Sequence, residues 1–168
     1  MDPIKIEEKL AELLKQNELY LGTAESCTGG LVANRITDIP GSSSFFLGGM
    51  VTYSYSSKMQ WLGVKEKTLA EYGAVSRETV AEMADGLAQR LGTICDRTRL
   101  LTISISGIAG PDGGTASKPV GLVWIGWCFN CDIRTASFQF QGDRISIKNQ
   151  SADQALLGAY TWLIEQLT

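Results

Sequence analysis

Short apolar runs alternate with helix-patterned segments along this chain, which leaves few folds open to it. The runs typical of strands are residues 19–24, 45–53, 100–106, 119–129 and 133–140. The last two form the best hairpin candidate, joined through Asn130-Cys131-Asp132. Because helices and strands mix and a hairpin stands near the end, the pattern predicts an α/β fold. The expected form is a three-layer α/β/α sandwich with a mixed parallel and antiparallel sheet.

Apolar residues in the other segments recur every three or four positions, as one face of a helix requires. The helices predicted in this way cover residues 4–16, 29–36, about 76–91 and about 146–166. Ser76 is a good N-cap for the third helix, and Pro40-Gly41 ends the second. No repeat, linker or low-complexity tract is visible, so residues 1–168 are predicted to form a single domain.

The composition is that of an ordinary globular protein, with 44% hydrophobic and 20% charged residues. No stretch approaches the roughly 18 apolar residues that suggest a membrane span. Met1-Asp2-Pro3 leads straight into a charged amphipathic segment, unlike a secretory signal peptide. We therefore expect a cytoplasmic location and no membrane partner.

The net charge of −3 comes from 15 basic and 18 acidic residues interspersed along the chain. Proteins that bind nucleic acids usually carry a basic patch or stripe, and none is visible. Direct binding to nucleic acid is therefore not expected.

Cys128 and Cys131 form a lone C-x-x-C pair in a chain without histidine. A zinc site there would need Cys27 and Cys95 to converge on it, or a carboxylate to substitute. The favoured interpretation is two small residues flanking a hairpin turn, with no metal and no cofactor.

The segment Ala24-Glu25-Ser26-Cys27-Thr28-Gly29-Gly30 lies where a strand is predicted to turn into a helix. Unpaired amides at a helix start can hold an anion, and glycine permits close approach of the backbone. Without histidine, hydrolysis centred on Ser26 cannot use a Ser-His-Asp triad, so a lysine or another group must accept the hydroxyl proton. On local grounds alone, a serine before glycines is more often a cap or a turn.

The segment Tyr53-Ser54-Tyr55-Ser56-Ser57-Lys58 follows the next predicted strand. Lys58 can act as a base only if its pKa falls from about 10.4 towards roughly 7–8, through burial or nearby positive charge. The apolar residues Met59, Trp61 and Leu62 make a suitable pocket conceivable. A solvated lysine at a helix start is the more common alternative.

Residues 106–115, with four glycines, follow the strand predicted over 100–106. Their amides could face a phosphate or a ribose, although the segment matches neither a Walker loop nor the dinucleotide fingerprint. A surface turn is the alternative. Farther along, Arg144 could grip a phosphate or carboxylate, and Asp143 could face the dipole of the last helix.

Together these segments resemble the CinA C-terminal domain family, which includes stand-alone nicotinamide-nucleotide amidases. The matching blocks are residues 24–30, 46–58, 73–76, 106–114, 118–121 and 142–144, in family order. The resemblance implies an α/β/α fold and a metal-independent, cofactor-free amidohydrolase. The implied reaction converts nicotinamide mononucleotide to nicotinate mononucleotide and ammonia.

The resemblance also implies roles for residues. Ser26 corresponds to the nucleophile, Lys58 to its base and Tyr53 to an assisting third member. Implied substrate-binding residues are Thr28, Gly29, Gly30, Ser106, Gly107, Gly110, Gly113 and Arg144. A pyridine nucleotide is the implied small-molecule partner, and a homo-oligomer the implied assembly.

The chain departs from the family pattern at two positions. Tyr55 stands where the family commonly has asparagine, and Lys148 where it commonly has arginine, so substrate choice is more open than reaction type. A catalytically silent nucleotide-binding regulatory module is the alternative function. An interaction protein linked to DNA uptake or recombination is suggested only by the family name. Cys27 as nucleophile is a minor variant, because no histidine exists to generate its thiolate.

Overall fold

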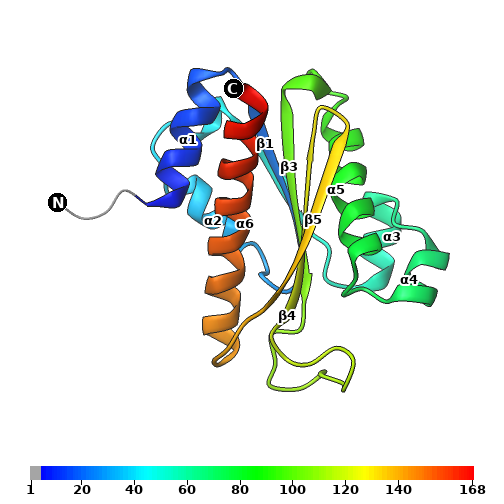
Figure 1. Ribbon diagram of the computed structural model, residues 1–168. Helices are drawn as coiled ribbons and strands as arrows, with labels where there is room; N and C mark the ends of the chain where they lie inside the picture. Colours follow the sequence, from blue (N-terminus) through cyan, green and yellow to red (C-terminus); the bar gives the residue numbers. More distant parts are fainter. Residues whose placement is uncertain (1–4) are drawn as a thin grey trace.

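The computed structural model describes residues 5–168 as a five-stranded sheet between two layers of helices (Figure 1). The strands are β1 (Tyr20–Glu25), β2 (Phe46–Val51), β3 (Leu100–Gly107), β4 (Leu122–Phe129) and β5 (Asp132–Gln139). The helices are α1 (Ile6–Gln16), α2 (Leu31–Thr37), α3 (Tyr55–Leu62), α4 (Glu66–Tyr72), α5 (Arg77–Leu91) and α6 (Arg144–Leu167). Helices α1, α2 and α6 cover one face of the sheet, and α3, α4 and α5 lie on the other. The predicted α/β/α fold is confirmed.

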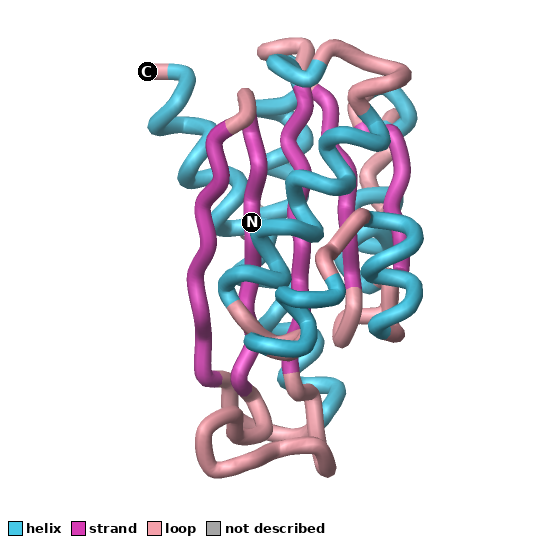
Figure 2. Tube along the Cα trace, turned by 90° about the vertical axis from the view of Figure 1, so that its right-hand side faces the viewer, coloured by secondary structure: helices cyan, strands magenta, loops and turns pink. Residues whose placement is uncertain are grey.

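The sheet is mixed, as predicted, with the strand order β2-β1-β3-β4-β5. Strand β1 pairs in parallel with β2 and with β3, whereas β3–β4 and β4–β5 are antiparallel. The carboxyl ends of β1, β2 and β3 therefore meet at one edge of the sheet. This is the lower edge in Figures 1 and 2, where the long loop between β3 and β4 also lies. In α/β sheets such an edge is the usual place for a ligand.

Several element boundaries differ from the sequence-based prediction. Helix α2 begins at Leu31 rather than Gly29, because Gly29 and Gly30 take φ angles of 62° and 97°, outside the right-handed helical region. Strand β2 is shorter at both ends than predicted. The pattern predicted neither the bounds of α3 nor the existence of α4. In the first predicted helix, residue 4 lies outside the described residues.

Strand β3 shows why alternation of polar and apolar residues misleads in this sheet. Thr102 and Ser104 look like solvent-facing positions, yet both side chains are fully buried beneath α5. Their hydroxyls donate to the backbone carbonyls of Ala84 (2.7 Å) and Val80 (2.6 Å) in that helix. Because buried hydroxyls need such partners, the two hydrogen bonds stabilise the packing of α5 on the sheet.

Helix α5 in turn determines where α3 sits. A Cβ atom on Gly86 of α5 would lie 1.7 Å from the carbonyl oxygen of Leu62, so only glycine permits this approach. Ser76 caps α5 as predicted, its hydroxyl accepting from the Thr79 amide at 3.2 Å. The close contact holds α3, and with it Lys58, against the carboxyl edge of the sheet.

The predicted hairpin is confirmed, and Asn130 and Cys131 form its turn with φ angles of 50° and 67°. Cys128 is buried in β4, and Cys131 is exposed at the turn. No group of three or more histidine, cysteine or acidic side chains within residues 5–168 is arranged to hold a metal ion.

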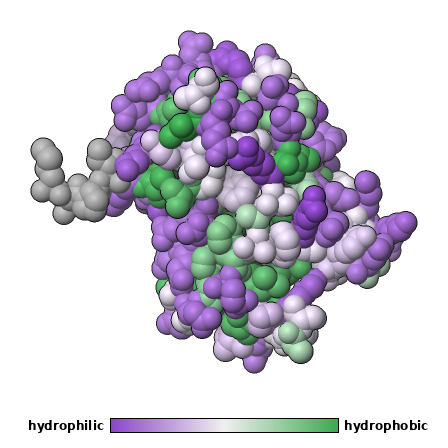
Figure 3. Space-filling view, viewed as in Figure 1, coloured by the Kyte–Doolittle hydropathy of each residue, from purple (hydrophilic) through white to green (hydrophobic). Residues whose placement is uncertain are grey.

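The surface seen in Figure 3 is largely polar, with hydrophobic residues gathered in its lower central part. Among residues 5–168, no helix has both the length and the apolar character needed to cross a bilayer.

Candidate active site

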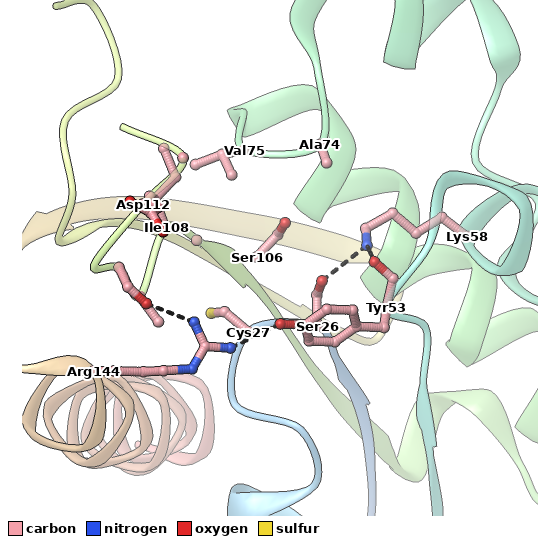
Figure 4. A pocket seen from close by; sticks show the side chains of 14 residues that line it. Ser26, Cys27, Tyr53, Lys58, Ala74, Val75, Ser106, Ile108, Asp112 and Arg144 are labelled. Carbon is pink, nitrogen blue, oxygen red and sulfur yellow. Dashed lines mark hydrogen bonds between the residues drawn. The ribbon is translucent and has the colours of Figure 1, made fainter. Parts of the chain in front are cut away.

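An open pocket of about 260 Å³ lies at the carboxyl edge of β1, β2 and β3 (Figure 4). Its lining residues come from the turn after β1, the segment between β2 and α3, the first turn of α3, the segment before α5, the end of β3 with the loop after it, and the start of α6. They are Ser26, Cys27, Tyr53, Lys58, Ala74, Val75, Ser106, Gly107, Ile108, Ala109, Gly110, Asp112, Gly113 and Arg144. Segments far apart in the sequence therefore build one site.

Ser26 is the first residue after β1 and is 8% exposed. Its amide donates to the carbonyl of Ile105 in β3 at 3.0 Å, and its own carbonyl accepts from the Gly29 amide at 3.0 Å. The strand pairing thus extends one residue past β1 before the chain turns. The Ser26 hydroxyl lines the pocket and is directed towards Lys58 (Figure 4).

Lys58 lies in the first turn of α3 and is fully buried. Its Nζ is 2.9 Å from the Ser26 Oγ, 2.6 Å from the carbonyl oxygen of Thr52 and 3.5 Å from that of Tyr53. Burial lowers the pKa of Lys58 to about 8, because removal from water penalises the charged form. A substantial fraction of Lys58 is thus neutral near physiological pH.

The three contacts of Lys58 fit the three N–H donors of an ammonium ion, and they fit equally the two N–H donors and the lone pair of the neutral amine. A neutral amine has two N–H donors and one lone pair, and carbonyl oxygens can only accept. The carbonyls of Thr52 and Tyr53 can take the two N–H groups, which leaves the lone pair for the hydroxyl proton of Ser26. The arrangement provides a direct path for moving that proton to Lys58, over a distance suited to general-base catalysis.

Tyr53 and Arg144 stand together at the rim of the pocket. The Tyr53 side chain is 59% exposed, and its hydroxyl accepts from Arg144 Nη2 at 2.9 Å. Arg144 Nη1 donates to the carbonyl of Gly110 at 2.7 Å. Tyr53 therefore meets Lys58 through its backbone carbonyl, whereas its hydroxyl faces Arg144 (Figure 4).

The end of β3 and the loop after it form the wall opposite Lys58. Ser106, Gly107, Gly110 and Gly113 all line the pocket, and the buried Ser106 directs its hydroxyl into it (Figure 4). Gly107 is required by packing, since a Cβ atom there would lie 2.5 Å from Val123 Cγ2. The predicted residues of this wall are thus placed where a ligand could contact them.

Thr28, Gly29 and Gly30 do not line the pocket, which differs from the sequence-based expectation. The Thr28 hydroxyl and the Gly30 amide both donate to the carboxylate of Glu25, at 2.6 and 3.0 Å. The Gly29 amide is taken by the Ser26 carbonyl. The anion that the helix start attracts is therefore a side chain of the protein itself.

Cys27 lines the pocket beside Ser26 but is poorly suited to nucleophilic attack. Burial, reinforced by the charge of Glu25, raises the pKa of its thiol to about 11. The thiolate is the reactive form of cysteine, and it is scarce at neutral pH with such a pKa. The geometry thus favours the Ser26 hydroxyl over the neighbouring thiol.

Sequence reasoning missed three contributions to the site. Ala74 and Val75 supply a wall, Glu25 holds the turn after β1, and the carbonyl of Thr52 accepts from Lys58. A glutamate directly before the serine could have indicated a carboxylate close to the helix start. Backbone carbonyls leave no signal in the sequence at all.

The two departures from the family pattern lie beside the pocket. The Tyr55 hydroxyl accepts from the Ala74 amide at 3.3 Å, so its ring supports the wall formed by Ala74. Lys148 lies one turn after Arg144 in α6, with its amine 3.8 Å from where a Cβ atom on Gly29 would be. Neither side chain lines the pocket or touches the Ser26–Lys58 pair.

Comparison with families of proteins matches residues 4–163 to the model of the CinA C-terminal domain. A relative from Clostridium novyi (strain NT) is 45% identical over 164 residues, which is 98% of this chain and 37% of that protein. A CinA-like protein of Chloroherpeton thalassium is 48% identical over 155 residues, covering 90% of this chain and 36% of that protein. The chain thus spans little more than a third of the length of these relatives.

A solved structure matches nearly all of the chain. It is a CinA superfamily protein from Klebsiella pneumoniae 700603, with a TM-score of 0.88 and 34% sequence identity. The alignment covers 95% of this chain and 96% of that one. The arrangement of sheet and helices described above is therefore shared with a protein of similar size.

Proposed function

Because the chain belongs to the CinA C-terminal domain family, we propose that it is a nicotinamide-nucleotide amidase with a serine nucleophile and a lysine base. The reaction would convert nicotinamide mononucleotide and water to nicotinate mononucleotide and ammonia. The observation that carries the proposal is the 2.9 Å contact between Lys58 Nζ and Ser26 Oγ inside an open pocket.

The first half of the reaction forms an acyl-enzyme. Neutral Lys58 accepts the hydroxyl proton while the Ser26 oxygen attacks the carboxamide carbon. Protonated Lys58 then returns that proton to the departing nitrogen, the carbon–nitrogen bond breaks, and ammonia leaves. Tyr53 would assist in two ways: its backbone carbonyl accepts from Lys58, and its hydroxyl accepts from Arg144 at the rim of the pocket.

The second half of the reaction releases the acid product. Lys58, again neutral, accepts a proton from water as the water oxygen attacks the acyl carbon. The bond to Ser26 breaks and its oxygen recovers the proton from Lys58. Amides that face the carbonyl oxygen in each step stabilise its negative charge, an effect worth about 3–4 kcal/mol per donor.

The pocket also offers a cation for the phosphate of a mononucleotide. Within residues 5–168, no carboxylate lies within ion-pairing distance of Arg144. Its guanidinium is instead held by neutral acceptors, Gly110 and Tyr53, so its charge is not cancelled. A planar guanidinium at the rim suits bidentate phosphate binding. A homo-oligomer and a cytoplasmic location remain predictions.

We expect the purified protein to release ammonia from nicotinamide mononucleotide, at a rate that a chelator such as EDTA does not change. A coupled assay for ammonia, with chromatography of the nucleotide products, measures this directly. Nicotinamide riboside, which lacks the phosphate, is the matched control substrate and should react more slowly. Binding of the mononucleotide without ammonia release would instead indicate the silent nucleotide-binding module.

The rate of ammonia release is expected to depend on pH through Lys58. Burial lowers its pKa to about 8, so below that pH the base is increasingly protonated. We expect kcat/KM to fall about tenfold per pH unit below the midpoint and to level off above it. Initial rates measured between about pH 5.5 and 9.5 test this, and a flat profile contradicts Lys58 as the base.

A further inference from the structure

We propose that Glu25 is a positioning residue: its carboxylate fills the amino end of α2 and thereby holds the turn that carries the Ser26 hydroxyl. The inference rests on the proposed function in taking Ser26 as the nucleophile. It adds a residue that neither touches Lys58 nor lines the pocket.

Glu25 is the last residue of β1 and is 1% exposed. Its Oε2 accepts from the hydroxyl of Thr28 at 2.6 Å and from the amides of Gly30 and Val32 at 3.0 and 3.1 Å. Its Oε1 accepts from the amide of Ala33 at 2.9 Å. Both oxygens therefore act as acceptors towards every neighbour, as an ionised carboxylate does.

These contacts replace a missing helix cap. The residue at the N-cap position of α2 is Gly30, which has no side chain to accept from the first amides of the helix. Glu25 reaches those amides from the preceding strand, and its charge is favourable at the positive end of the helix. Removing this buried carboxylate is expected to be costly, because a side chain without acceptors would leave the buried Thr28 hydroxyl and Val32 amide unpaired.

The turn that carries Ser26 is consequently fixed by hydrogen bonds on two sides. On one side, the Ser26 amide is bound to Ile105 of β3, and on the other, Glu25 holds Thr28 and Gly30. Lys58 is fixed separately by the carbonyls after β2. The 2.9 Å contact between Ser26 and Lys58 therefore depends on the turn keeping its place. A displacement of about 1 Å can cost about 100-fold in rate.

Glu25 acts on the geometry of the site and not on the basicity of Lys58. Burial is the largest cause of the lowered pKa of Lys58, and it does not depend on the side chain at position 25. A substitution at Glu25 is thus expected to lower kcat and to leave the pH midpoint where it was. A change in the base itself would move that midpoint.

The test compares wild type with Glu25→Gln and Glu25→Asp in two assays. The first is ammonia release from nicotinamide mononucleotide. The second is labelling of Ser26 by a fluorophosphonate, in which the serine oxygen bonds to phosphorus, fluoride leaves and Lys58 takes the proton. For Glu25→Gln we expect both rates to fall about 10- to 100-fold with KM and the pH midpoint unchanged. Glu25→Asp, which keeps the charge on a shorter stem, should recover part of the loss.

Glu82 provides a matched control on the opposite face of the sheet. Its carboxylate accepts from the Lys65 amide and the Thr68 hydroxyl, both at 2.8 Å, at the start of α4. Glu82→Gln should lower the melting temperature and leave the labelling rate of Ser26 unchanged. Should Glu25→Gln fail to fold, Thr28→Val removes one of the four donors and should slow labelling several-fold.

Labelling of a folded Glu25→Gln protein at the wild-type rate would overturn the inference. If the labelling rate of Ser26 fell equally in Glu25→Gln and Glu82→Gln, Glu25 would contribute only to general stability, and the inference would be overturned as well. If wild type labels at Ser26 but releases no ammonia, the proposed substrate fails while the labelling rates still decide the role of Glu25. If wild type does not label at Ser26, there is no activated serine to position and the inference falls.

Discussion

Replacement of Ser26 by alanine is expected to lower kcat for ammonia release by about 10⁴- to 10⁶-fold. The hydroxyl is the only group at that position able to form the acyl-enzyme, and the pocket supplies it with a buried amine at 2.9 Å. The fold should be unaffected, because the Ser26 backbone carries the bonds to Ile105 and Gly29. Rates of ammonia release, together with acid-quench mass spectrometry of an acyl group on Ser26 in wild type, provide the measurement.

Cys27→Ser is the control for the Ser26 variant. The two residues are neighbours in the pocket, but the thiol has a raised pKa and should not substitute for the hydroxyl. We expect Cys27→Ser to keep activity within about tenfold of wild type, since the two side chains differ only in the atom at the γ position. Activity that survives in Ser26→Ala and disappears in Cys27→Ser would assign the reaction to the thiol.

Replacement of Lys58 by methionine is expected to lower kcat by about 10³- to 10⁴-fold, the largest loss after that of Ser26. Methionine fills a similar volume but cannot accept the serine proton. Lys58→Arg should not restore activity, because a guanidinium stays protonated at all accessible pH values. Fluorophosphonate labelling of Ser26 should fall in parallel, which separates loss of the base from loss of substrate binding.

Thermodynamic stability supplies an independent measurement on the same variant. The folded-state pKa of Lys58 is about 8 against an ordinary value of 10.5, which corresponds to about 3 kcal/mol of preference for the neutral form. Below pH 8 Lys58 is protonated in the folded protein, which then bears the full free-energy penalty of burying the charged amine. In the unfolded chain the charged lysine is in water and carries no such penalty. As pH rises from about 8 to 10.5, only the unfolded state still binds the proton, so wild type gains stability.

Relative to Lys58→Met, wild type should therefore become more stable by about 3 kcal/mol between about pH 7.5 and 10.5. Denaturant unfolding of both proteins across this range measures the difference. A difference that does not change with pH would show that Lys58 titrates normally in the folded protein. In that case the amine would be charged near neutral pH and unable to act as the proposed base.

Much of this architecture was accessible from the order of the segments. The hairpin at Asn130-Cys131, the helix capped by Ser76 and the strand after residue 99 follow from local rules of periodicity, capping and turn chemistry. Helix α4 did not, because seven residues are too few to show a clear period. The bound hydroxyls of Thr102 and Ser104 also could not be foreseen, since their partners belong to another layer.

The residues of the candidate site divide in the same way. The sequence by itself determined the residue types available: a hydroxyl, a lysine and glycine-rich turns without any histidine. Only the tertiary structure decided that Lys58 is buried, that it meets Ser26, and that Glu25 occupies the helix start. The reason is that a pKa and a hydrogen bond depend on solvent exclusion and on distances between segments 32 residues apart. These quantities exist only once the sheet has brought the carboxyl ends of β1 and β2 together.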